Sequence, residues 1–143
     1  MDFRAMAEAV QPEVVAFRRD LHEHPEASFQ EFRTTEQIAK EMDKLGIPYR
    51  RFEPTGLIAE IKGGKPGKTI ALRADIDALS ITEKTGLPFA SKNDGFMHAC
   101  GHDTHAAMLV GAAKVLMQVK DQLCGTVKLL FQQIGRASCR ERV

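Results

Sequence analysis

The sequence has no excess of charge of either sign. Its 20 Lys and Arg residues are balanced by 19 Asp and Glu, which leaves a formal net charge of +1, and the two signs are interspersed. Such a balance gives no electrostatic attraction for nucleic acid or for an anionic membrane surface. We therefore expect neither nucleic acid nor a membrane as a partner.

Long apolar runs are also missing. None reaches the roughly 20 residues that a membrane-spanning helix needs, and the start of the chain, MDFRAMAE, is too polar for a signal peptide. The three cysteines, at 100, 124 and 139, do not form the pattern of a disulfide framework. These absences favour a cytoplasmic protein. The 143 residues, 43% of them hydrophobic, suffice for one buried core, and they contain no repeats or low-complexity segments.

Two amphipathic helices are expected in the first third of the chain. Residues 2–10 are weakly helical, Pro12 suits the first turn of a new helix, and Pro25 ends that helix. The segment SFQE at 28–31 has the form of a capping box, in which serine and glutamate satisfy each other's backbone amides. Apolar residues then recur at helical spacing up to Gly46, which is a good helix stop.

The rest of the chain alternates between strands and a helix. Strands are expected at 49–52, 57–62, 69–74 and 125–132. The glycine-rich stretch 63–67 suits a hairpin between the second and third strands, and the third is apolar on both faces, as a central strand would be. After an irregular loop at 80–97, a helix at 104–120 is apolar nearly all round and should be buried. This order predicts an α/β fold with a mixed, partly parallel sheet flanked by helices.

The segment MHACGHDTH at 97–105 concentrates the chemistry of the chain. Cys and His are typical transition-metal ligands, and Cys100 and His102 can converge on one ion if the intervening glycine turns the backbone sharply. Asp103 is then expected to be the N-cap of the buried helix, with His105 as a group behind a ligand or towards the substrate. The alternative is a small buried thiol beside a satisfied core histidine. We favour the metal site, because burying so many polar groups without partners is costly.

Two further pairs of residues are candidates. Asp75 and Asp77 follow the third expected strand, where open α/β sheets bind ligands, and one carboxylate there is suited to orienting a histidine ligand. The alternative is a solvated strand end with aspartates as turn formers. His22 and His24 end the first helix, where we expect surface or capping groups.

Three ordered motifs carry a resemblance to a known family. RRDLHEHPE at 18–26, LRADIDAL at 72–79 and MHACGHDTH at 97–105 resemble the amidohydrolase branch of the dinuclear-metal aminoacylase and carboxypeptidase family. Hippurate hydrolase, indole-acetyl-amino-acid hydrolase and N-acetyl-diaminopimelate deacetylase belong to that branch. The resemblance covers about 10–132 and implies the N-terminal part of a zinc-peptidase-like catalytic domain.

The resemblance also implies a reaction and roles for residues. Members hydrolyse the amide bond of small N-acetyl, N-benzoyl or similar amino acids with a metal-activated water and two divalent ions, of manganese, zinc or nickel. Cys100 and His102 would be metal ligands, Asp77 the orienting active-site aspartate and Asp75 its catalytic neighbour. The parent protein is then expected to be a homodimer or a larger oligomer.

The sequence departs from the family after Gln132. Family members continue into Pro-Ala-Glu-Glu, which supplies the general base and another ligand, whereas this chain continues into QIG without a glutamate pair. The segment 133–143 resembles the translation of a sequencing adapter. We therefore interpret 1–132 as the N-terminal part of the catalytic domain and 133–143 as a non-native tail. The general base is then absent from this chain, and we expect the chain alone to be inactive.

Two alternative functions remain at this point. One is a non-catalytic metal-binding domain. The other is a metal-independent thiol hydrolase that uses Cys100 with His105, although the sequence supplies no obvious third member for such a dyad.

Overall fold

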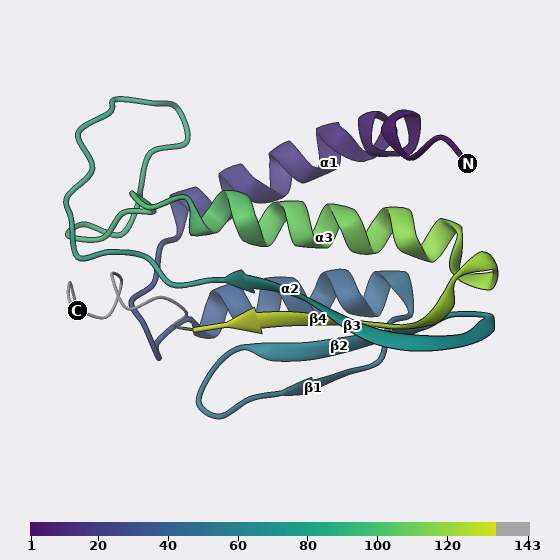
Figure 1. The fold of residues 1–143 in the computed structure, drawn as a ribbon. Helices are drawn as coiled ribbons and strands as arrows, with labels where there is room; N and C mark the ends of the chain where they lie inside the picture. The colour runs from purple at the N-terminus through teal and green to yellow at the C-terminus, as the bar shows by residue number, and fades with distance from the viewer. Residues whose placement is uncertain (134–143) are drawn as a thin grey trace.

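The computed structural model describes residues 1–133 of the chain, and these form a four-stranded sheet with helices packed against it (Figure 1). In chain order the elements are α1 (Phe3–Glu23), α2 (Phe32–Leu45), β1 (Tyr49–Arg51), β2 (Leu57–Lys62), β3 (Lys65–Asp75), α3 (His102–Gln118), the short 3-10 turn η1 (Lys120–Gln122) and β4 (Cys124–Gln132). The mixed α/β architecture expected from the sequence is confirmed. Within the described part of the chain, no helix combines the length and apolar character needed to cross a bilayer.

The sheet order is β1-β2-β4-β3, so the last strand is an inner one. β4 runs antiparallel to β2 and parallel to β3. The predicted hairpin between the second and third strands is therefore wrong, and β3 lies at the edge of this sheet and not at its centre. The physical reason is the crossover through α3, which returns the chain parallel to β3. The glycine-rich stretch packs against the start of β4 instead, where the Gly63 N–H donates to the Gly125 carbonyl at 2.8 Å.

The core lies on one face of the sheet. Alternate residues of the two inner strands are buried there: Leu57, Ala59, Ile61, Val127, Leu129 and Phe131. Side chains of α1, α2 and α3 complete the same cluster, including Leu21, Ile38, Met42 and Val110. The edge position of β3 leaves Ile70 56% exposed. The apolar sequence of β3 therefore does not reflect burial of that strand among the described residues.

α1 is a single helix that lies alongside α3 (Figure 1). The expected new start at Pro12 does not occur, because an exposed proline removes one backbone hydrogen bond and the helix continues past it. The two helices approach closely at Gly111, where a Cβ would lie 2.7 Å from Val14 Cγ2. A residue without a side chain is therefore suited to this crossing.

α2 begins differently from the prediction. The capping box at 28–31 does not form, because Ser28 donates to the Gln133 carbonyl and Glu31 is buried. The Glu26 carboxylate instead accepts from the backbone N–H groups of Arg33 and Thr34, at 3.0 and 2.6 Å. The expected end of the helix at Gly46 is confirmed, since that residue is left-handed with φ of 69°.

The irregular loop at 80–97 leaves the sheet and returns to it. Leu79 and Met97 close its base, each donating its N–H to the carbonyl of the other at 3.0 Å. The loop extends at the end of the molecule where β3 and β4 finish and α3 begins (Figure 1). This return places the 97–105 segment next to the residues that follow β3.

Candidate metal centre

The candidate metal ligands Cys100 and His102 lie on either side of a glycine turn at the start of α3. Gly101 has φ of 98°, a left-handed conformation that L side chains rarely adopt, and it occupies the N-cap position. His102 is consequently the first residue of the helix and Asp103 the second. The prediction of Asp103 as the N-cap is wrong, because the turn ends one residue earlier and its carboxylate has other partners.

His102 is held between the two aspartates that follow β3. Its Nδ1 lies 2.9 Å from the Asp77 carbonyl and 3.0 Å from Asp77 Oδ1, while its Nε2 lies 3.7 Å from Asp75 Oδ2. Burial opposes the protonated ring, but the hydrogen bonds and charge of Asp77, together with Asp75, outweigh it and raise the pKa of His102. In the neutral ring, an Nδ1–H donated to Asp77 fixes the tautomer that carries its lone pair on Nε2.

Cys100 and His105 lie on either side of this histidine in the chain. Cys100 is exposed and comes directly before the glycine of the turn. The exposed His105 ring is 6.0 Å from the His102 ring, centroid to centroid. It lines a shallow hollow of about 250 Å³ with Arg73, Ala74 and Asp75. The structure therefore brings the candidate residues of the 72–79 and 97–105 motifs together at one end of the sheet.

These donors fit part of a transition-metal site. An imidazole with a fixed tautomer follows a thiol on a tight turn, with carboxylates behind, which is a donor set suited to such ions. Asp77 Oδ2 is buried and has no hydrogen-bond partner among the described residues. Across residues 1–133, however, no three His, Cys, Asp or Glu side chains form a metal-ligand cluster. Further ligands are needed for a stable site, because three or four from the protein are usual.

Two buried ionisable residues near the centre were not singled out from the sequence. Glu31 is 0% exposed and accepts from Thr55 at 3.0 Å. Burial raises the pKa of Glu31 to about 7, and the charge of Asp77 adds to the rise. Burial also lowers the pKa of His98 to about 4, so this ring is neutral near pH 7. In the sequence, Glu31 has the spacing of a helix-capping residue, and this pattern gives no indication of its contact with Thr55.

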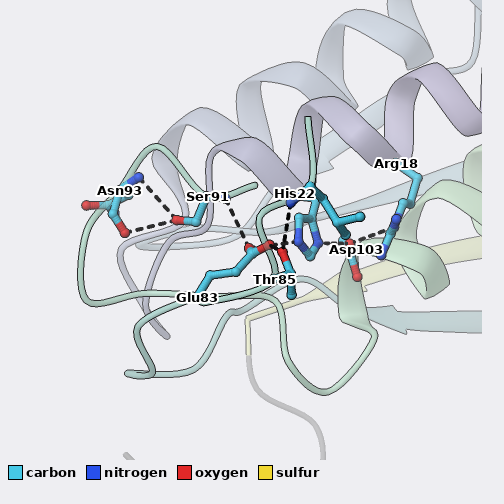
Figure 2. A network of polar contacts seen from close by, with 8 residues as sticks. Arg18, His22, Glu83, Thr85, Ser91, Asn93 and Asp103 are labelled. Atoms are coloured by element: carbon cyan, nitrogen blue, oxygen red, sulfur yellow. Dashed lines mark hydrogen bonds and ion pairs between the residues drawn. The ribbon is translucent and has the colours of Figure 1, made fainter. Parts of the chain in front are cut away.

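The 18–26 motif contains a further buried residue, His22, whose contacts are shown in Figure 2. The expectation that His22 is a surface or capping group is wrong, since it is 2% exposed. Its two ring nitrogens lie 2.8 Å from Asp103 Oδ2 and 2.9 Å from Glu83 Oε1. Arg18 Nε lies 2.8 Å from the same Asp103 oxygen. His24 is half-buried and its Nδ1 donates to the Asp20 carbonyl, in keeping with the expected capping role.

Comparisons with known proteins agree with this arrangement of motifs. The profile described as peptidase family M20/M25/M40 matches residues 71–133. The chain is 53% identical over 124 residues to N-acetylcysteine deacetylase of Bacillus subtilis, covering 83% of this chain and 32% of that protein. It is 43% identical over 132 residues to N-acyl-L-amino acid amidohydrolase of Geobacillus stearothermophilus, covering 92% of this chain and 36% of that protein.

A solved structure supports the same relationship. The Bacillus subtilis YXEP protein, described as a dinuclear metal binding peptidase from the M20 family, superimposes with a TM-score of 0.83 at 52% identity. The match covers 87% of this chain and 35% of that chain. The chain therefore spans about a third of the length of the relatives that it matches.

Proposed function

Since this chain is homologous to the amidohydrolases of peptidase family M20/M25/M40, we propose that it is the amino-terminal part of a metal-dependent enzyme that hydrolyses N-acyl amino acids. The observation that carries this proposal is the His102–Asp77 pair, set behind the Cys100 turn at the start of α3. A fixed histidine next to a turn-borne thiol is expected of metal ligands.

Cys100 and His102 would hold the metal, as two ligands of a centre with two divalent ions. When bound, such ions polarise the amide carbonyl and lower the pKa of a bound water. Asp77 accepts the Nδ1–H of His102 and so orients its ring, and Asp75 lies on the Nε2 side of the same ring. We further propose that the metals are manganese, zinc or nickel.

The substrate class follows from the relatives and from the site. Two relatives are named for N-acetylcysteine and for N-acyl-L-amino acids, which supports a small N-acetyl, N-benzoyl or similar amino acid as substrate. We propose a cytoplasmic parent protein that forms a homodimer or a larger oligomer and has no nucleic-acid or membrane partner. The absence of nucleic-acid and membrane partners is argued from the balanced charge and from the lack of long apolar runs in the sequence.

The proposal places the general base outside this chain. No glutamate pair follows Gln132, and the proposed non-native tail lies outside the described residues from position 134 onward. We therefore expect no turnover by the 143-residue chain itself. The complete enzyme is the gene product that continues the native reading frame.

The test is hydrolysis of N-acetylcysteine and N-benzoylglycine by that gene product. We expect a chelator to abolish turnover, added manganese or zinc to restore it, and Cys100→Ser to lower metal content. His24→Gln is the matched control, because the His24 ring contacts the backbone carbonyl and the carboxylate of Asp20 in the adjoining helix. Activity that survives chelation but is lost in His105→Ala would support the thiol hydrolase instead. Metal binding without turnover of any N-acyl amino acid would support the non-catalytic domain.

A further inference from the structure

The imidazole of His22 bonds a carboxylate at each ring nitrogen. Asp103 accepts at Nδ1 and Glu83 at Nε2, and both side chains are buried (Figure 2). The two ring nitrogens of an imidazole lie on different sides of the ring, so one His22 side chain can bridge two carboxylates. Hydrogen bonds in which one partner is ionised are among the stronger ones in proteins.

Both carboxylates are also bonded by other groups. The Arg18 guanidinium pairs with Asp103 at 2.8 Å. Burial opposes ionisation of Glu83, but its hydrogen bonds with Thr85, Ser91 and His22 lower the pKa of this carboxyl. The Ser91 N–H donates to the same Glu83 oxygen as His22, at 3.0 Å. The ring of His22 therefore lies between two carboxylates that are themselves fixed.

These contacts join three segments that are far apart in sequence. His22 belongs to the last turn of α1, Glu83 to the 80–97 loop and Asp103 to the first turn of α3. The loop is also fixed to α1 by its aromatic side chain, since the Phe89 ring meets the His22 ring edge-on at 5.6 Å. The Arg19 guanidinium lies over the Phe89 ring, 4.7 Å from its centroid.

Two of these segments lead directly to the candidate ligands. Asp103 follows His102 directly, and the 80–97 loop leads through Met97 into the turn that bears Cys100. A shift of Asp103 or of the loop base would therefore move both ligands. His22 bonds Asp103 and Glu83, so its effect on the site is exerted through these two residues.

We propose that His22 is a positioning residue of the metal site. Bonded to both Asp103 and Glu83, it holds the start of α3 and the ligand-bearing turn against the 80–97 loop. The inference rests on the proposed function, because it assigns His22 a part in that same site. It also gives the opening motif a role that neither packing nor helix capping explains.

The test is a Co²⁺ titration of the complete gene product that continues the native reading frame, followed by thiolate-to-cobalt charge-transfer absorption. We expect the apparent Kd to rise about 10- to 100-fold in His22→Gln and in Glu83→Gln, the usual effect of losing a residue that orients a ligand. His24→Gln is the matched control, since it makes the same change two residues away and should bind like the unmutated gene product. Thermal unfolding of each variant reports whether it is folded.

The outcomes separate this inference from the proposed function. A folded His22→Gln or Glu83→Gln chain with an unchanged Kd would overturn the positioning role. If His22→Gln fails to fold, Glu83→Gln decides, because the loop carboxylate is not part of the α1–α3 packing. An absent cobalt–thiolate band in the unmutated gene product, or one that survives Cys100→Ser, would overturn the ligand assignment and the inference with it.

Discussion

At the scale of single residues, ionisable side chains are buried around the start of α3. Glu31, Asp77, His98, His102 and Asp103 are all buried, although burial of charge without partners is costly. Asp77 is paired with His102, and Asp103 is paired with Arg18 and His22, which offsets the cost of burying their carboxylates. Glu31 and His98 instead favour their neutral forms. Their protonation is therefore coupled to folding.

Glu31→Gln should remove a pH dependence of stability. The folded pKa of Glu31 is about 7 against 4.5 for an ordinary glutamate, so the protonated carboxyl favours the folded state. That stability is fully present below pH 4.5 and is lost as pH rises through 7. We expect Glu31→Gln to match the parent chain near pH 4.5 and to be more stable at pH 8 by up to about 3 kcal/mol.

Denaturant unfolding at the two pH values measures this difference. The amide keeps an oxygen for the Thr55 hydrogen bond, so the comparison isolates the charge. Glu53→Gln, at an exposed position, is the control and should change stability equally at both pH values. A Glu31→Gln chain that is less stable at pH 8 than the parent would contradict the assignment of a protonated Glu31.

At the scale of elements, local patterns predicted the helices and strands but not their partners. The helical spacing up to Gly46 and the apolar stretches of β2 and β4 were interpreted correctly, because both signals lie within a few residues. The hairpin prediction failed because β4, some 60 residues later, is the common neighbour of β2 and β3. His22 was misjudged for the same reason, since Asp103 and Glu83 are 81 and 61 residues away.

The start of α2 should depend on Glu26 and not on the capping-box residues. Its carboxylate accepts the N–H groups of Arg33 and Thr34, which have no partner within the helix. We expect Glu26→Ala to lower the free energy of unfolding by about 1 to 2 kcal/mol, the range for a lost N-terminal cap. Glu23→Ala is the control, because Glu23 pairs with an exposed lysine and such pairs contribute less than about 1 kcal/mol. Equal effects in the two variants would argue against the capping role.

At the scale of the whole molecule, the apolar surface is unevenly covered. α1, α3 and β3 border an apolar groove of about 600 Å³, lined by residues that include Phe3, Val10, Leu72, Met108 and Val115. Met108 is 54% exposed although α3 was expected to be buried. Exposed apolar patches of this kind bind hydrophobic ligands readily.

The 143-residue chain should therefore bind a hydrophobic dye in its folded state. We expect Met108→Lys to reduce the dye fluorescence at 25 °C by at least about half, because it places a charge within the groove. Ile81→Lys makes the same kind of change at an exposed site outside the groove and should have little effect. Dye binding that is equal in both variants would show that the groove is not the site.

We have proposed that this chain is the amino-terminal part of a metal-dependent N-acyl amino acid amidohydrolase, with Cys100 and His102 as two of the metal ligands. The most direct test is the nucleotide sequence of the source genome downstream of the codon for Gln132. We expect an open frame that encodes a glutamate pair within the next few residues, to supply the general base and a further ligand. A frame that continues without such a pair would contradict the amidohydrolase assignment.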